Sequence, residues 1–175
     1  MASNVQAIRR FTPSPPAKVA AVCYRQRGGS VEFLLVNTES GRWTFPKGSV
    51  EAHLGPRDSA ALEAIEEAGA LGRISEEHFC VYLHAKGSCR RGAEKHLQVA
   101  AFLLHVQELV EPEEGHRNPT WFSAREAKLR LAHRRSARYQ RELTRVVDNA
   151  VDLLYSRPKL RLQRSPFSGQ RLRNA

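Results

Sequence analysis

Three glutamates on one predicted helix form the cluster of this chain that is best suited to chemistry. Glu63, Glu66 and Glu67 stand at positions i, i+3 and i+4, so a helix would place their carboxylates on one face. Carboxylates this close repel one another, and a solvated helix face usually carries cations at the same offsets. A hard divalent cation such as Mg²⁺ or Mn²⁺, which takes carboxylate oxygens as ligands, would make the cluster favourable. The alternative interpretation is an acidic helix face exposed to water.

The rest of this helix predicts a fixed position for the acids. Its other face carries Leu62 and Ile65, whose apolar side chains indicate packing against a core. Gly69 follows as a typical C-cap glycine. Asp58 or Ser59, which follow Pro56, is expected to cap the start. The acids are therefore expected to project from a helix that is anchored on its opposite side.

A short strand before the helix is expected to bring a lysine side chain and a glycine backbone next to the acid cluster. Residues 43–45 are predicted to be extended and to stop at Pro46. Lys47 and Gly48 follow at once, and glycine lets the backbone approach other groups closely.

Residues 48–70 resemble the signature box of the Nudix hydrolases, G-x5-E-x7-R-E-U-x-E-E-x-G-U, preceded by the Pro-Lys-Gly found in several branches. The spacing agrees throughout. The matching positions are Gly48, Glu63, Glu66, Glu67 and Gly69. The resemblance implies an α/β fold, the Nudix-type α/β/α sandwich with a mixed β-sheet, over residues 17–156. It also implies a metal-dependent hydrolase.

Two positions depart from the family pattern. Leu54 replaces the first glutamate of the box, and Leu62 replaces its arginine. In the family these two groups help to hold the loop and to orient the metal-binding acids. Losing both together leaves no single buried charge unpaired. We hypothesise that an apolar contact between Leu54 and Leu62 replaces the charged pair, with Glu51 partly covering the role of the missing acid.

The resemblance also implies roles for the matching residues. Glu63, Glu66 and Glu67, together with the Gly48 carbonyl, would hold Mg²⁺ or Mn²⁺. Glu67 and Glu63 are the expected catalytic residues, while the identity of the general base stays open. Glu113 and Glu114 are further candidates in a later loop, where a solvated acidic loop is the competing interpretation.

Substrate binding is expected to involve cations near the box. Lys18 and Arg42 resemble the polyphosphate-binding positions of the diphosphoinositol polyphosphate phosphohydrolases, and Lys47 is the next candidate. For each one taken singly, an exposed solubilising cation is an equally good interpretation. The sequence thus favours hydrolysis of a diphosphate linkage in a nucleoside diphosphate linked to another group. A dinucleoside polyphosphate or an inositol pyrophosphate would be the substrate.

Two other functions stay open. The departures from the box are compatible with a catalytically weak domain that binds a nucleotide or RNA, although all three helix acids remain. Basic residues in the C-terminal tail are compatible with nucleic-acid binding, but aromatic side chains are scarce there. A small-molecule polyphosphate is therefore preferred over nucleic acid as the partner. Oligomeric state is not indicated.

Composition indicates one basic domain. The 175 residues carry 28 Lys and Arg against 18 Asp and Glu, a formal net charge of +10, which favours anionic partners. Residues 1–16 are expected to form an N-terminal arm, 17–157 the Nudix domain and 158–175 a basic tail without regular structure. Three cysteines without metal-site spacing and the lack of a signal or membrane-length apolar segment predict a cytoplasmic protein.

The remaining elements follow from periodicity and turn residues. A hairpin is expected around Gly28 and Gly29, and a last helix is predicted to carry an apolar stripe toward a core. The five arginines on or near that helix are interpreted as a solvated face rather than a basic wall. Besides residues 43–45, the predicted strands are 18–24, 31–37, 79–85, 97–106 and 120–122, with extended structure also at 72–74. The predicted later helices are 124–131 and 136–155.

Overall fold

The computed structural model describes residues 16–86, 95–156 and 161–167. The expected N-terminal arm up to residue 15, most of the basic link between residues 86 and 95, and much of the basic tail lie outside the described residues. The elements run in the order β1 (Lys18–Arg27), β2 (Ser30–Asn37), β3 (Trp43–Thr44), β4 (Lys47–Ser49), α1 (Pro56–Ala68), β5 (Ala70–Ser75), β6 (Cys80–Lys86), β7 (Lys95–Leu109), the 3₁₀ turn η1 (Gly115–Arg117), β8 (Thr120–Ser123), α2 (Ala124–Ala132), α3 (Ala137–Ser156) and β9 (Leu162–Arg164).

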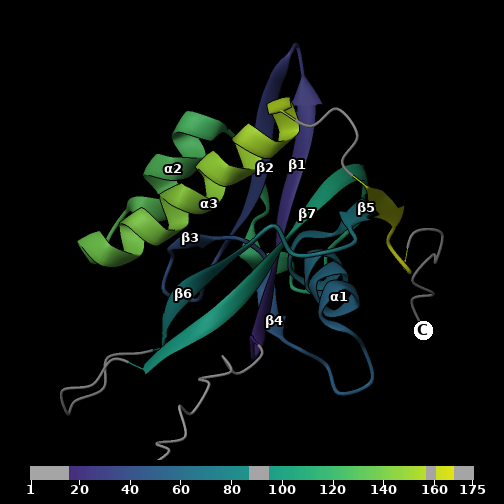
Figure 1. The fold of residues 1–175 in the computed structure, drawn as a ribbon, viewed down its shortest axis with the longest axis horizontal. Helices are drawn as coiled ribbons and strands as arrows, with labels where there is room; N and C mark the ends of the chain where they lie inside the picture. Colours follow the sequence, from purple (N-terminus) through teal and green to yellow (C-terminus); the bar gives the residue numbers. More distant parts are fainter. Residues whose placement is uncertain (1–15, 87–94, 157–160, 168–175) are drawn as a thin grey trace, which may run out of the picture.

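A mixed sheet separates two helical layers. Its strands follow the order β3-β2-β1-β7-β5-β9, while β4, β6 and β8 add to β1, β7 and β2. β1 and β7 are parallel, whereas the other pairs are antiparallel. Figure 1 shows α2 and α3 on one side of the sheet and α1 on the other. The expected α/β/α sandwich with a mixed sheet is therefore confirmed.

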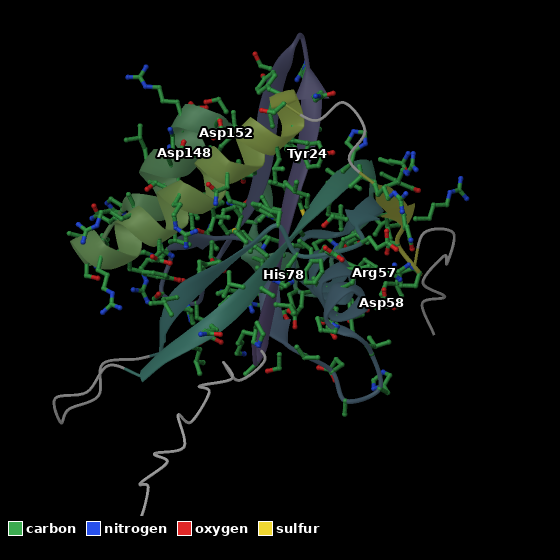
Figure 2. All side chains as sticks on the ribbon, in the orientation of Figure 1. Tyr24, Arg57, Asp58, His78, Asp148 and Asp152 are labelled. Carbon is green, nitrogen blue, oxygen red and sulfur yellow. The ribbon has the colours of Figure 1, made fainter. Side chains whose placement is uncertain are left out.

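Each face of the sheet has its own buried cluster because alternate side chains of β1 point to opposite faces. Ala20 and Val22 face Leu143 and Val147 of α3, whereas Val19 and Ala21 face Ala60 and other small residues of α1. The alanines of α1 let this helix approach the sheet closely. Figure 2 labels Arg57 and Asp58 on α1 and Asp148 and Asp152 on α3, which marks the two helical layers.

Local signals predicted several element ends. Gly28 and Gly29 have positive φ in the hairpin between β1 and β2. Ser123 caps α2 in a reciprocal capping box with Glu126. The tail differs from expectation, because residues 162–164 form β9 and pair with β5. The loop expected to lack regular structure likewise contains the single turn η1.

Candidate active site

Helix α1 positions the three glutamates, and its ends explain how. The expected cap at Asp58 or Ser59 is wrong: Gly55 is the N-cap residue and Pro56 occupies the first turn, where its missing N–H has no helical partner to lose. Gly69 ends the helix in the left-handed conformation, as expected, with φ of 61°. A Cβ at Gly69 would lie 2.0 Å from the Val110 carbonyl oxygen, so this position also needs glycine for space.

Ser59 has a different role from capping. Its hydroxyl donates to the Gly55 carbonyl oxygen and accepts from the Glu51 backbone N–H, both at 3.0 Å. The side chain is fully buried. It therefore fastens the loop before the helix to the first turn of α1.

Glu67 is the most deeply buried acid of the cluster, with 3% of its surface exposed. The Lys47 backbone N–H donates to its Oε2 atom at 3.0 Å. The Arg117 guanidinium lies 2.9 Å from its Oε1 atom. Both oxygens are thus engaged, one by the strand that precedes the box and one by the turn η1.

Glu63 lies against Gly48. A Cβ added to Gly48 would fall 1.5 Å from Glu63 Oε1, so the carboxylate fills the space that a side chain would need. The β1–β4 register pairs Val19 with Gly48, and Lys18 donates to Ser49 Oγ at 3.1 Å. The structure therefore brings together Gly48, Glu63 and Lys18, three of the residues predicted for the site.

The acids influence one another electrostatically. The pKa of Glu63 is raised to about 7, chiefly by burial and then by the charges of Glu67, Glu66 and Glu114, against the opposing effect of Lys18. Burial also raises the pKa of Glu66, with additional repulsion from Glu113 and Glu114. Burial raises the pKa of Glu67 although Lys47 and Arg117 oppose the change. The cluster therefore holds a surplus of negative charge that a cation would relieve.

The donor set fits a hard divalent cation, because it consists of carboxylates next to the backbone at Gly48. Glu63 forms no salt bridge within the described part of the chain. As the side chains stand, however, no three His, Cys, Asp or Glu residues among those described are arranged to hold a metal ion. Glu67 is paired with Arg117 instead.

The loop acids do approach the helix. The Glu114 backbone N–H donates to the Glu66 carbonyl oxygen at 2.9 Å, and its carboxylate accepts from Arg117 Nε at 2.6 Å. The negative charge of Glu113 contributes to the raised pKa of Glu66.

The predicted substrate-binding cations all influence the pKa of one residue, His84 of β6. The pKa of His84 is lowered to about 4, chiefly by burial and then by the charges of Lys47, Lys18, Arg135 and Arg42. Its Nδ1 atom lies 2.6 Å from the Tyr139 hydroxyl of α3. Arg135 donates to the carbonyl oxygen of Trp43, the residue after Arg42, and its guanidinium lies over the Tyr139 ring.

Arg135 differs from its predicted role on a solvated helix face. It is half-buried and donates to the carbonyl oxygens of Leu131 and Trp43, both at 2.6 Å. Arg145 also contacts the sheet, donating to the Val81 carbonyl oxygen at 3.0 Å. Arg134, Arg138 and Arg141 are exposed, as that interpretation expects.

Sequence reasoning assigned no role to Arg117 or Tyr139. Both stand far along the chain from the residues they contact, and neither belongs to the box. The signal that could have pointed toward Arg117 is indirect: a box without its arginine leaves the acid cluster without that cation. The proposed Leu54–Leu62 contact stays a prediction. Both residues are half-buried and neither belongs to the two buried clusters of the described residues.

Among the described residues, no helix combines the length and apolar character that a membrane span requires.

Comparisons with known proteins identify the family and the fold. A NUDIX domain family model matches residues 14–143. The fold resembles a C. elegans Ap4A hydrolase binary complex, with TM-score 0.59, 22% identity and coverage of 81% of this chain and 99% of that chain. A possible asymmetric diadenosine tetraphosphate hydrolase from Jonesia denitrificans gives TM-score 0.59 and 22% identity, over 81% and 98% of the two chains. The NUDIX domain of Shewanella oneidensis NrtR with ADP ribose gives TM-score 0.57 and 14% identity, over 78% and 86%.

The structural likenesses, at these identities, establish the fold. The family model spans most of the chain, including the whole of α1 and the Gly48 segment. The chain therefore belongs to the NUDIX domain family.

Proposed function

We propose that this chain hydrolyses a diphosphate linkage in a nucleoside diphosphate linked to another group, and that it depends on Mg²⁺ or Mn²⁺. Glu63, Glu66, Glu67 and the Gly48 carbonyl would hold the metal. The observation that carries the proposal is the convergence of helix and strand: Glu63 fills the space over Gly48 while Glu67 accepts a hydrogen bond from Lys47.

The chain's own groups would bind and orient the substrate. A bound divalent ion would neutralise the phosphate oxygens and activate water. Lys18 and Lys47 lie beside the acids and would attract the phosphates electrostatically. Glu67, buried and held at both oxygens, would keep a constant orientation.

A polyphosphate substrate would explain why four cations influence the same region. Lys18, Arg42, Lys47 and Arg135 all act on His84, so several phosphates would find partners in this region. This supports a dinucleoside polyphosphate or an inositol pyrophosphate. Diadenosine tetraphosphate is the first compound to test, because two similar structures are described as hydrolases of that compound.

The test is product release from diadenosine tetraphosphate, ADP-ribose and an inositol pyrophosphate, with Mg²⁺ or Mn²⁺. Glu67→Gln is expected to lower kcat/KM by at least about 100-fold, because even outer partners of metal ligands are worth about 10- to 100-fold. Glu32→Gln is the matched control, since Glu32 pairs with Arg25 on the β1–β2 hairpin. Equal background release by wild type and Glu67→Gln on every substrate would contradict hydrolysis.

The alternative is a catalytically weak domain that binds nucleotides or RNA. One observation favours it: Arg117 already neutralises Glu67, and the described acids are not arranged around a metal position. Calorimetric binding of the same compounds without turnover, in the presence of metal, would be the expected result under this alternative.

A further inference from the structure

Arg117 joins three elements around the most buried acid of the site. Its guanidinium lies 2.9 Å from Glu67 Oε1 and donates to Glu114 Oε2 at 2.6 Å. A longer hydrogen bond of 3.4 Å reaches the Asn37 carbonyl oxygen at the end of β2. Only 17% of the Arg117 side chain is exposed. The planar group therefore spans α1, the loop before η1 and the sheet in one fixed orientation.

The segment that carries Arg117 is attached along the last turn of α1. The Val110 N–H donates to the Gly69 carbonyl oxygen at 2.8 Å, and the Glu114 N–H donates to that of Glu66 at 2.9 Å. These two backbone bonds set the distance between η1 and the helix. Arg117 consequently reaches Glu67 from a segment that is itself fixed to the helix bearing the acids.

The box has no cation at its arginine position, and its Arg57 pairs with Asp58 instead. Leu62 stands beside Glu63 where the family pattern has arginine, and Leu54 stands where it has glutamate. Both leucines are half-buried and uncharged. The guanidinium beside the acids therefore comes from residue 117, about fifty positions further along the chain.

We propose that Arg117 is the positioning residue for Glu67 and replaces, from η1, the missing arginine of the box. Together with the Lys47 N–H, it fixes the plane of the Glu67 carboxylate so that the carboxylate is presented toward a divalent ion. The inference rests on the proposed metal-dependent function. The opposite role would be that of an internal competitor, in which Arg117 occupies the place of the metal ion.

Metal binding separates the two roles. Free Mn²⁺ is measured by electron paramagnetic resonance during titration of the full-length protein. Arg117→Met is expected to raise the Kd for Mn²⁺ by about 10- to 100-fold, the usual effect of losing an outer partner of a ligand. Arg117→Lys should raise this Kd by a smaller factor. The lysine keeps the positive charge but loses the planar guanidinium that donates to two carboxylates at once. An unchanged or lower Kd in Arg117→Met would overturn the proposal.

Two further variants make the result specific. Arg25→Met removes a guanidinium that also pairs with a glutamate at 2.6 Å, but far from the box, and should leave the Kd unchanged. Glu67→Gln should abolish tight binding. If Glu67→Gln binds Mn²⁺ like wild type, the proposed metal site itself fails. If Glu67→Gln loses binding and Arg117→Met does not, only the positioning role fails.

Folding is checked by urea unfolding of every variant, because Arg117→Met leaves Glu67 buried with one partner fewer. Should Arg117→Met not fold, Arg117→Lys decides the question: a weaker Mn²⁺ affinity supports the proposal and an unchanged affinity overturns it. Steady-state kinetics adds a second readout. A positioning role predicts a fall in kcat at saturating metal with little change in KM.

Discussion

At the scale of single residues, Gly48 is needed for space rather than for backbone conformation. A Cβ at this position would overlap Glu63 Oε1 at 1.5 Å, and the flexible Glu63 side chain would have to move. Gly48→Ala is therefore expected to keep the free energy of unfolding within about 0.5 kcal/mol, as most substitutions outside the core do. The Kd for Mn²⁺ should rise about 10-fold or more.

Gly55→Ala is the control, because a Cβ there meets no atom within 4 Å. It should leave Mn²⁺ binding unchanged. Equal affinity of Gly48→Ala and wild type would show that the Glu63 carboxylate does not need this position.

His84 is expected to make the stability of the fold depend on pH. Its pKa falls from an ordinary 6.5 to about 4, chiefly through burial and then through neighbouring cations. Above pH 6.5 both folded and unfolded chains are neutral at this residue, so it has no effect there. Between pH 6.5 and 4 the unfolded chain takes up the proton first, so stability falls as pH falls.

The measurement is the urea midpoint at several pH values. His84→Gln is expected to flatten the decline between pH 6.5 and 4. His78→Gln is the control because His78 is exposed. A decline as steep in His84→Gln as in wild type would exclude His84 as its source.

At the scale of elements, Ser59 connects the box loop to helix α1. Ser59→Ala would leave the Glu51 N–H and the Gly55 carbonyl without this partner. The Gly55 carbonyl still accepts from the Ser59 backbone N–H. A typical hydrogen bond contributes about 0.5–1.5 kcal/mol net, so the free energy of unfolding should fall by a similar amount. Because the loop joins Gly48 to the helix, Mn²⁺ affinity should fall as well.

Ser123→Ala provides the comparison for this effect. It removes the cap of α2 and should lower stability by about 1 kcal/mol. Its position at the start of α2 predicts no change in Mn²⁺ affinity. If Ser59→Ala and Ser123→Ala both leave metal binding unchanged, the loop does not depend on Ser59 for its position.

The helix and its acids could be predicted because their signals are local. The spacing of Glu63, Glu66 and Glu67 and the position of Gly69 need only the geometry of one helix. The predicted helix start was wrong because Pro56 can occupy the first turn without a side-chain cap. The Ser59 hydroxyl instead donates to the Gly55 carbonyl oxygen. Arg117 was not assigned because only tertiary contacts bring it to Glu67.

At the scale of the whole molecule, the site depends on how both sides of the sheet are covered. α1 and η1 supply the acids and Arg117 from one side, while α3 supplies Tyr139 and the loop before α3 supplies Arg135 near the cations. The parallel pairing of β1 with β7 keeps Lys18 and the strand leading to η1 in register. No single segment contains all the proposed site residues. The box alone could therefore predict only the glutamates of α1 and Gly48.

The C-terminal tail takes part in the fold through β9. Arg73 donates to the Leu162 carbonyl oxygen, Arg57 of α1 donates to Gln163, and the Ser165 N–H donates to the Gly72 carbonyl oxygen. Phe167 packs against the buried cluster on the α1 side. A short polar strand of this kind has no clear alternating pattern, which explains why the sequence predicted an unstructured tail.

Removal of residues 157–175 is therefore expected to expose the edge of β5. Hydrogen exchange should become faster in β5, because β9 no longer covers it, while β2 on the other side of β1 should keep its protection. Diphosphate hydrolysis should persist, since the proposed site residues lie outside the removed segment. Unchanged exchange in β5 would contradict a structural role for β9. A salt-dependent affinity for RNA that disappears with the tail would instead support the nucleic-acid function considered from the sequence.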